Sequence, residues 1–252
     1  RGGAREMIDQ GLFERFPVDQ VYGMHNMPGI PEGHFTITSG PMMAAFAHFE
    51  CTIHGKGGHS STPYLNVDPI NVGTKLVTAW QQIITQDIPA QEVAVIATTE
   101  FHAGTAFNIT PETAVLRGSC RSLSNETAAL IEKRMAEIAQ QVCTADGATC
   151  ELEYHQAYPV LVNEPECTSF AADVARSVVG DERVSTNQMP IMGSEDFAEM
   201  LLLNPGAYIF IGNGVESRGG CMIHNPGYDF NDNNLKPGAQ YWVSLACKYL
   251  AA

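Results

Sequence analysis

The sequence predicts an α/β protein, in which an α/β domain is interrupted by an inserted, ferredoxin-like α+β domain. Two observations predict this class. Strand and helix patterns alternate near both ends of the chain, and the middle of the chain has a strand–helix–strand order twice in succession. The 252 residues are enough for one large domain or two modest ones. An apolar fraction of 44% with 17% charged residues is ordinary for a globular protein.

The first flank, residues 1–45, begins with a helix pattern. Apolar side chains recur at helical spacing over Ala4–Phe13, which predicts a short helix. An apolar strand follows at Val18–Met24 and ends at His25. The Pro- and Gly-rich residues 28–33 then predict a rigid loop, because no regular element continues through such a stretch.

The middle of the chain, residues 46–158, contains four strand patterns and two long helix patterns. Asp68-Pro69 and Ser124 are favourable helix starts, since Asp and Ser cap helices and Pro suits the first helical position. The predicted elements are, in order, Phe46–Ile53, Asp68–Ile84, Val93–Thr99, Ala114–Cys120, Ser124–Gly147 and Thr149–Tyr154. This βαββαβ order is typical of a ferredoxin-like sandwich, with four antiparallel strands and two helices on one face.

The second flank, residues 159–252, returns to the alternating pattern. It predicts a helix at Thr168–Val179, a short strand near Val184, a strand at Ala207–Gly212 and a final helix from Pro237 to Leu250. The flanks together form the α/β domain that residues 46–158 interrupt.

Composition excludes several classes of partner. A net charge of -14 disfavours binding to nucleic acid or to an anionic membrane surface, because both need a basic face. No apolar run is long enough to span a bilayer, and no signal peptide is recognisable. Seven cysteines without a CxxC motif fit a reducing compartment better than a disulfide scaffold, so we expect a cytoplasmic protein.

Two histidines are candidate metal ligands. His25 follows an apolar strand, and ligands of open α/β sheets collect at the carboxyl ends of strands. His224 lies on a loop after a Gly-rich stretch. Either ring can instead be bonded to backbone groups in a turn. Two histidines so far apart in sequence are weak evidence of a shared site, and taken alone they favour the turn interpretation.

His59 and Asn108 are candidate substrate contacts. His59 ends the segment Gly55-Lys56-Gly57-Gly58-His59, whose glycines expose the imidazole, and an exposed imidazole can donate to a developing oxyanion. Asn108 precedes Ile109-Thr110-Pro111, where its carboxamide can donate to a substrate carbonyl or carboxylate. The structural alternatives are a surface histidine in a hairpin and an asparagine that caps its own turn. The residues alone favour both alternatives.

Glu195 and Asp196 follow Gly193-Ser194, and we expect them in the first turn of a helix, where the helix dipole favours acidic side chains. No Gly-x-Ser-x-Gly elbow, no His-Glu-x-x-His and no plausible Cys–His pair occur in the sequence. Nucleophilic catalysis and single-zinc proteolysis therefore lack support.

Taken together and in this order, these segments resemble the amidohydrolase branch of the M20 metallopeptidases, which includes aminoacylases, hippurate hydrolases and auxin-conjugate hydrolases. The matching segments cover nearly the whole chain. They are residues 2–8 (Gly-Gly-Ala-Arg-Glu-Met-Ile), 23–25 (Gly-Met-His), 55–59 (Gly-Lys-Gly-Gly-His), 68–69 (Asp-Pro), 107–111 (Phe-Asn-Ile-Thr-Pro), 193–197 (Gly-Ser-Glu-Asp-Phe) and 223–226 (Ile-His-Asn-Pro).

The resemblance implies a two-metal catalytic domain, formed by residues 1–45 and 159–252, with an inserted lid and dimerisation domain at residues 46–158. It implies that His25 and His224 bind the metal ions, two per active site, which can be Zn, Mn, Co or Ni. It also implies that His59 reaches the active site of a partner subunit and stabilises the tetrahedral intermediate, and that Asn108 contacts the substrate from the lid. The expected substrate is a small N-acyl amino acid, and the expected assembly is a homodimer formed through the lid.

One departure from the family pattern changes this expectation. The family's general base is the first Glu of a Glu-Glu pair that precedes the segment matching Arg1, and a Cys-Gly-His ligand motif stands further upstream. Neither motif occurs in this sequence, which opens on Arg1-Gly2-Gly3 instead of Met, and we interpret this opening as an interior cut. We therefore expect the chain to be inactive alone. The alternatives are a carboxypeptidase or dipeptidase of the same superfamily and a non-catalytic dimerisation module.

Overall fold

The computed structural model describes residues 2–251, apart from the side chains of residues 217 and 218. The chain forms two compact units. Within the described residues, unit 1 contains residues 2–43, 161–191 and 195–251, and unit 2 contains residues 44–160 and 192–194.

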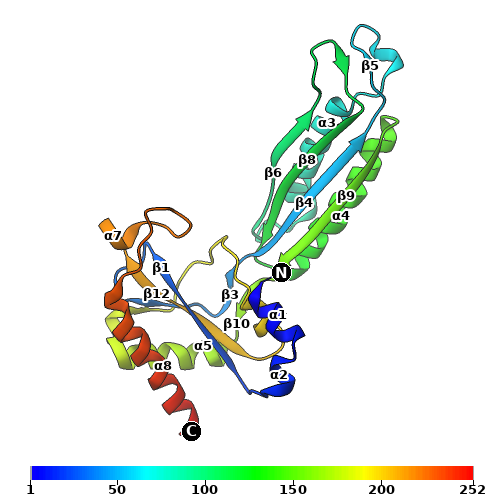
Figure 1. The fold of residues 1–252 in the computed structure, drawn as a ribbon. Coiled ribbons are helices and arrows are strands. Elements are labelled where there is room, and N and C mark those ends of the chain that lie inside the picture. Colours follow the sequence, from blue (N-terminus) through cyan, green and yellow to red (C-terminus); the bar gives the residue numbers. More distant parts are fainter. Residues whose placement is uncertain (1, 252) are drawn as a thin grey trace. The chain divides into compact units, whose positions relative to one another are not determined.

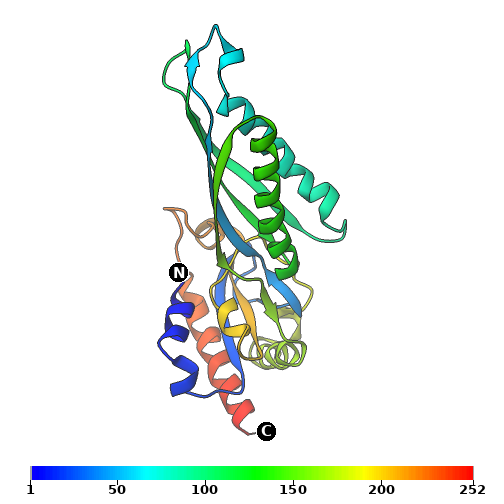
Figure 2. The ribbon, with the colours of Figure 1, turned by 90° about the vertical axis from the view of Figure 1, so that its right-hand side faces the viewer.

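Unit 2 is a four-stranded antiparallel sheet covered on one face by two helices (Figures 1 and 2). The strand order is β6-β8-β4-β9, with β4 at Ala45–His54, β6 at Ala94–Ala103, β8 at Thr113–Ser122 and β9 at Thr149–Tyr158. The helices are α3 (Pro69–Gln82), which continues into a π-turn at Ile83–Asp87, and α4 (Asn125–Ala145). Both helices pack on the same side, because their apolar residues share one core with the inward residues of the sheet.

The helix starts in unit 2 follow from the sequence. Asp68 Oδ1 accepts the backbone N–H of Ile70 at 2.9 Å, and Ser124 Oγ accepts that of Thr127 at 3.2 Å. Between the two helices, the fully buried indole of Trp80 donates to the carbonyl of Met135 at 3.1 Å. This bond satisfies the one polar group of the largest side chain in the core.

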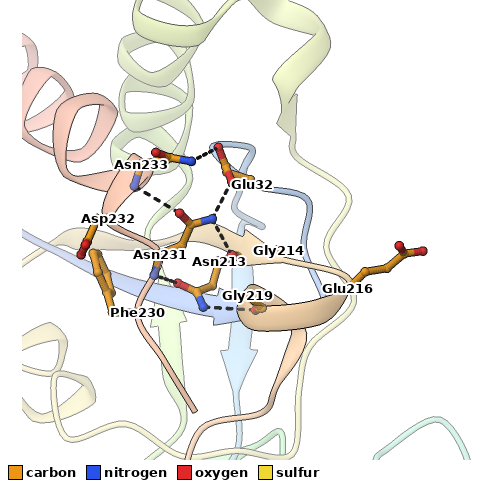
Figure 3. A pocket seen from close by; sticks show the side chains of 9 residues that line it. All are labelled: Glu32, Asn213, Gly214, Glu216, Gly219, Phe230, Asn231, Asp232 and Asn233. Atoms are coloured by element: carbon orange, nitrogen blue, oxygen red, sulfur yellow. Dashed lines mark hydrogen bonds between the residues drawn. The ribbon is translucent and has the colours of Figure 1, made fainter. Parts of the chain in front are cut away.

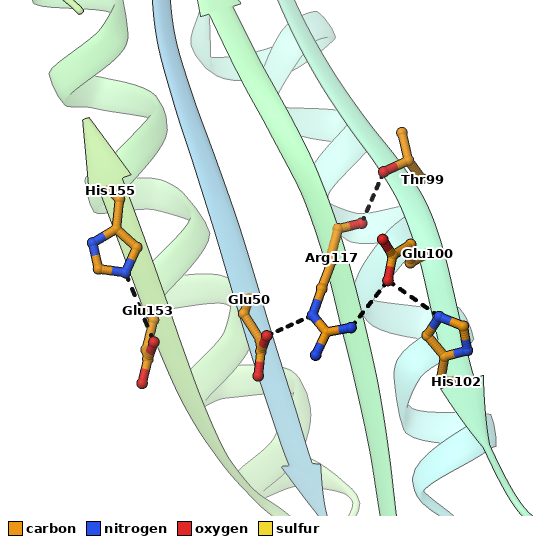
Figure 4. Close-up of polar contacts among 7 residues, drawn as sticks. All are labelled: Glu50, Thr99, Glu100, His102, Arg117, Glu153 and His155. Carbon is orange, nitrogen blue, oxygen red and sulfur yellow. Dashed lines mark hydrogen bonds and ion pairs between the residues drawn. The ribbon is translucent and has the colours of Figure 1, made fainter. Parts of the chain in front are cut away.

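The other face of this sheet carries polar side chains (Figure 4). Along β4, Phe49 and Cys51 point into the core, whereas His48 and Glu50 point outward. On the outward face, Arg117 donates to Glu50 at 2.5 Å and to Glu100 at 3.0 Å. The hydrogen bond from Arg117 holds the pKa of Glu100 below its usual value.

Unit 1 contains a mixed four-stranded sheet in the order β1-β12-β2-β11. The strands are β1 (Val21–Pro28), β2 (Phe35–Thr36), β11 (Val184–Ser185) and β12 (Gly206–Gly214). β1 runs parallel to β12, β2 runs antiparallel to β12, and β11 runs parallel to β2.

The central strand β12 is buried on both faces. Its residues Ala207, Ile209 and Ile211 pack in a core with α5 (Pro165–Val179) and α8 (Leu235–Leu250). The alternate residues Tyr208 and Phe210 pack in a second core with α6 (Ala198–Leu201) and with a two-stranded ladder of β3 (Gly40–Met43) and β10 (Leu161–Asn163). Unit 1 is therefore layered, because its sheet has one apolar core on each face and the buried strand β12 contributes side chains to both.

The predicted helix at residues 4–13 is two helices in the structure, α1 (Gly3–Asp9) and α2 (Leu12–Arg15). The break is at Gly11, whose φ of 84° is left-handed and suits glycine. The remaining short elements are β5 (Gly58–His59), β7 (Ile109–Thr110), α7 (Ser217–Gly220) and 3-10 turns at Pro63–Leu65, Asp181–Arg183 and Asp232–Asn234.

The predicted fold class is confirmed: the chain combines α/β and α+β parts in the expected order. The predicted end of the strand before His25 was wrong. β1 continues to Pro28, so His25 lies inside the strand and not at its end, because the pairing with β12 extends as far as Gly214. Across residues 2–251, none of the helices has the length and apolar character needed to cross a membrane.

Candidate functional site

His25 is held in β1 with one ring nitrogen occupied. The residue is half-buried and is paired with Phe210 of β12. Its Nδ1 lies 2.6 Å from the carbonyl oxygen of Asn26. A carbonyl can only accept, so in the neutral ring Nδ1 carries the hydrogen and Nε2 keeps its lone pair. A backbone contact of this kind commonly fixes the tautomer of a metal-ligating histidine.

His224 lies on the exposed loop after α7 and has a positive φ of 64°. An Asn225 turn follows it, in which Asn225 Oδ1 accepts from Gly227 N at 2.8 Å. The loop is attached to the sheet, because the Asn26 amide donates to the Tyr228 hydroxyl. The residue next to His25 is thus bonded to a residue of the His224 loop, and the structure links the two segments although they are far apart in sequence.

A cavity of about 420 Å³ opens beside the carboxyl end of β12 (Figure 3). Three carboxylates, those of Glu32, Glu216 and Asp232, are among its lining groups. Asn231 donates to Glu32 at 2.6 Å and to the Asn213 carbonyl at 3.1 Å. This edge of the sheet is where ligands of α/β proteins collect. The sequence did not single out these lining residues, because they come from three separate segments of the sequence.

Glu195 and Asp196 do not stand in the first turn of a helix as predicted, because α6 begins only at Ala198. Asp196 instead accepts the backbone N–H of Ala4 at 2.9 Å and so stabilises the start of α1. Glu195 accepts the hydroxyl of Tyr208 at 2.7 Å. Burial, with the neighbouring Glu195 charge, raises the pKa of Tyr208.

His59 and Asn108 lie together in unit 2. β5 pairs antiparallel with β7, so that His59 is opposite Ile109, and Ser60 N donates to the Asn108 carbonyl at 3.1 Å. Both side chains are exposed, at the end of unit 2 that carries β5 in Figure 1. Of the four predicted site residues, His25 and His224 therefore belong to unit 1, and His59 and Asn108 belong to unit 2.

The tautomer of His59 is also fixed. Its Nδ1 accepts the backbone N–H of Ser61 at 3.1 Å and lies 2.8 Å from the Ser61 hydroxyl. In the neutral ring the hydrogen is consequently on Nε2, which is left as a donor. Sequence reasoning missed Ser61. A Ser two residues after an exposed His in a turn was the available signal.

Exposed apolar side chains lie close to His59 and Asn108 in the sequence. Phe107 is fully exposed, and Tyr64, at 81%, is nearly so. Leu65 and Ile109 are more than half exposed. Exposed apolar side chains that gather on one surface often mark a place that contacts another molecule.

The ligand set for a metal pair is incomplete in residues 2–251. The described residues contain no group of three or more His, Cys, Asp and Glu side chains arranged to hold a metal ion. His25 has the ring chemistry of a ligand, and His224 adds a second imidazole. Two imidazoles alone do not close the coordination of two divalent ions.

Comparison with known proteins gives consistent relatives. The chain is 36% identical to the hippurate hydrolase of Campylobacter jejuni subsp. jejuni over 249 residues, which are 99% of this chain and 64% of the relative. It is 35% identical to thermostable carboxypeptidase 2 of Saccharolobus solfataricus, over 98% of this chain and 62% of the relative. The chain thus spans less than two thirds of the length of these curated relatives.

Solved structures agree with the fold. A protein described as an aminohydrolase from methicillin-resistant Staphylococcus aureus superposes with a TM-score of 0.89 at 31% identity, covering 99% of this chain and 63% of that one. A dinuclear metal-binding peptidase of the M20 family from Bacillus subtilis superposes with a TM-score of 0.80 at 24% identity, covering 100% of this chain and 62% of that one.

The family itself follows from a model that covers nearly all of the chain. The model described as peptidase family M20/M25/M40 matches residues 1–248. The resemblance carried by the sequence motifs is thereby confirmed, and the chain belongs to peptidase family M20/M25/M40.

Proposed function

We propose that this chain is part of a binuclear metal-dependent amidohydrolase that cleaves the amide bond of N-acyl amino acids or related small conjugates. The observation that carries the proposal is the ring of His25, whose Nδ1 is bonded to the Asn26 carbonyl and whose Nε2 is left with its lone pair. In this proposal His25 and His224 each bind one ion, and the ions are Zn, Mn, Co or Ni. When bound, the ions supply an activated water as the nucleophile.

His59 and Asn108 have the substrate-contacting roles in this proposal. The Nε2–H of His59 donates to the oxygen that becomes negative as the amide carbon turns tetrahedral, and the Asn108 carboxamide holds the substrate from the same surface. We further propose that the protein is a homodimer formed through unit 2, so that these residues serve the site of the partner. The exposed apolar side chains close to His59 and Asn108 in the sequence support this assembly.

The substrate class is supported by the hippurate hydrolase, whose name describes an N-acyl amino acid. A second candidate is a metallo-carboxypeptidase or dipeptidase, which is favoured by the Saccharolobus solfataricus carboxypeptidase at nearly equal identity. The third reading is a non-catalytic dimerisation module of the same fold. We also infer a reducing, cytoplasmic location, which the seven unpaired thiols support.

Residues 1–252 are inactive alone in this proposal, since the described residues contain no group of three or more side chains that could hold a metal ion. Any remaining ligands and the general base then come from outside this sequence. A test is to assay residues 1–252, and the same chain with any residues encoded upstream, for metal content and for hydrolysis of N-acyl amino acids and of peptides.

In the longer chain, His25→Ala and His224→Ala are expected to lose bound metal and hydrolysis together, whereas His102→Ala on unit 2 retains both. Full metal content in either variant would remove that histidine from the ligand set. Cleavage of peptides without cleavage of N-acyl amino acids would favour the carboxypeptidase or dipeptidase reading. If the metal-loaded chain hydrolyses neither class of substrate, the result would favour the interpretation as a non-catalytic dimerisation module.

A further inference from the structure

Two exposed histidines face each other on the uncovered side of the unit 2 sheet. His48 of β4 and His155 of β9 are direct partners in the antiparallel ladder, and both side chains point away from the helices. Their ring centroids are 5.1 Å apart, with an interplanar angle of 35°. Directly opposite residues of an antiparallel pair hold their Cβ atoms about 4.5–5.5 Å apart, so the backbone itself keeps the two rings close.

This spacing is suitable for a shared metal ion. With a metal–nitrogen distance of ~2.0–2.1 Å and about 1.1 Å from a ring nitrogen to the ring centroid, two imidazoles bound at a tetrahedral angle have centroids roughly 5.2 Å apart. The observed separation of 5.1 Å agrees with that value. We propose that His48 and His155 form a surface site for a divalent transition-metal ion of the Ni²⁺, Cu²⁺ and Zn²⁺ group, separate from His25 and His224.

The neighbouring charges favour a cation at this place. Glu153 stands on β9 two residues before His155, and its Oε2 lies 3.7 Å from the His155 Nε2 (Figure 4). Glu50, the partner of Glu153 in the ladder of β4 and β9, forms an ion pair with Arg117 at 2.5 Å. The charge of Arg117 is therefore already neutralised by Glu50 and Glu100. The carboxylate of Glu153 thus lies beside the His155 imidazole, and it adds negative charge where the ion would bind.

The protein provides two nitrogen ligands here, and water completes the coordination, because the described residues contain no group of three or more ligands in metal-binding positions. Such a site is open and exchanges its metal readily. It still joins β4 to β9, so an ion that binds the folded sheet stabilises it by mass action. At an ion concentration of 100 times the dissociation constant, the folding equilibrium constant rises about 100-fold.

The test is a calorimetric titration of the chain with Ni²⁺, alongside His48→Gln, His155→Gln and the double variant. His102→Gln is the matched control, since His102 is an exposed histidine on β6 of the same sheet. We expect each single variant to lose one bound Ni²⁺, or to bind it with affinity lowered by at least the ~10-fold that even an outer-shell partner contributes. The double variant should lose no more than either single variant, because one chelate is removed in each case.

A second measurement is the rise of the thermal unfolding midpoint with Ni²⁺, which should be equal in the wild type and in His102→Gln and smaller in both test variants at the same Ni²⁺ concentration. Equal Ni²⁺ binding in the wild type, His48→Gln and His155→Gln would overturn the proposal. A Ni²⁺-dependent rise of the unfolding midpoint that is the same in these three proteins would overturn it as well. Neither measurement depends on hydrolysis. The proposed amidohydrolase function and the proposed metal site at His48 and His155 can therefore be refuted independently of each other.

Discussion

Gly23 lies two residues before His25 on β1, and the ring of Tyr208 occupies the space that a side chain at this position would need. A Cβ at Gly23 would lie 2.4 Å from the Tyr208 ring and 3.2 Å from that of Phe197. Tyr208 is buried and also donates to Glu195, so the ring cannot move aside freely. The glycine therefore sets the distance between β1 and the Glu195 segment.

We predict that Gly23→Ala lowers the free energy of unfolding by about 1–3 kcal/mol, because the methyl group overpacks this core. Chemical denaturation followed by circular dichroism measures the change. Gly3→Ala is the control, since the nearest atom to its Cβ would be Asp196 Oδ2 at an ordinary 3.7 Å, and it should change stability by less than about 0.5 kcal/mol. Equal stability of the two variants would show that Tyr208 has room to move.

At the level of single residues, the sequence indicated candidate site residues, but it did not predict the hydrogen-bond partners of their side chains. The resemblance named His59 and Asn108 together, and the structure places His59 on β5 and Asn108 directly before its partner strand β7. It did not predict that Ser61 fixes the His59 tautomer, or that Asp196 bonds to Ala4. Such partners depend on the path of loops in space, which no local pattern in the sequence encodes.

Helix α5 begins with a carboxylate cap. Glu164 accepts the backbone N–H of Cys167 at 2.7 Å, and this hydrogen bond holds the pKa of Glu164 below its usual value. A carboxyl group whose pKa is lowered by folding stabilises the folded state above its unfolded pKa of ~4.3, and this contribution is lost as the pH falls through the folded pKa.

We therefore predict that Glu164→Gln is less stable than the wild type at neutral pH and that the difference shrinks as the pH falls below about 4.3. Urea unfolding at a series of pH values between 7 and 3 measures it. Glu151→Gln, at an exposed position of β9, serves as the control for a general loss of negative charge. A difference that stays constant over this pH range would contradict the assigned role of the Glu164 charge.

Long elements were predicted from the sequence, and of the two-residue strands only the one near Val184 was, which is β11 in the structure. The patterns of α3, α4 and β4 are periodic over many residues, and the caps at Asp68 and Ser124 are as expected. β2, β5 and β7 have only two residues each, which is too short for any periodicity. They exist because a distant strand provides their hydrogen-bond partners, and this information is not local.

The whole molecule contains one tryptophan in each unit. Trp80 is fully buried in unit 2, and Trp242 is exposed on α8 of unit 1. Unit 2 has its own core of strand and helix residues, so it has what an independently folding domain needs.

We predict that residues 44–160 fold when expressed alone and unfold in one cooperative transition. In the full chain, Trp242→Phe leaves Trp80 as the remaining indole, and its fluorescence should report a transition with the same denaturant midpoint as the isolated segment. Trp80→Phe follows unit 1 in the same way. An isolated segment without a cooperative transition would mean that its core depends on the rest of the chain.

The ladder of β3 and β10 has a consequence for the evolution of this chain by insertion or loss of a domain. Met43, the last residue before the unit 2 segment, is the direct partner of Leu161, close to where the chain returns to unit 1. The two ends of the segment therefore emerge side by side, and joining them needs only a short hairpin turn. A gene could gain, lose or exchange the whole stretch at this point without altering a strand of the unit 1 sheet. Among relatives, the largest differences in length and the sharpest changes in sequence are accordingly expected between Met43 and Leu161.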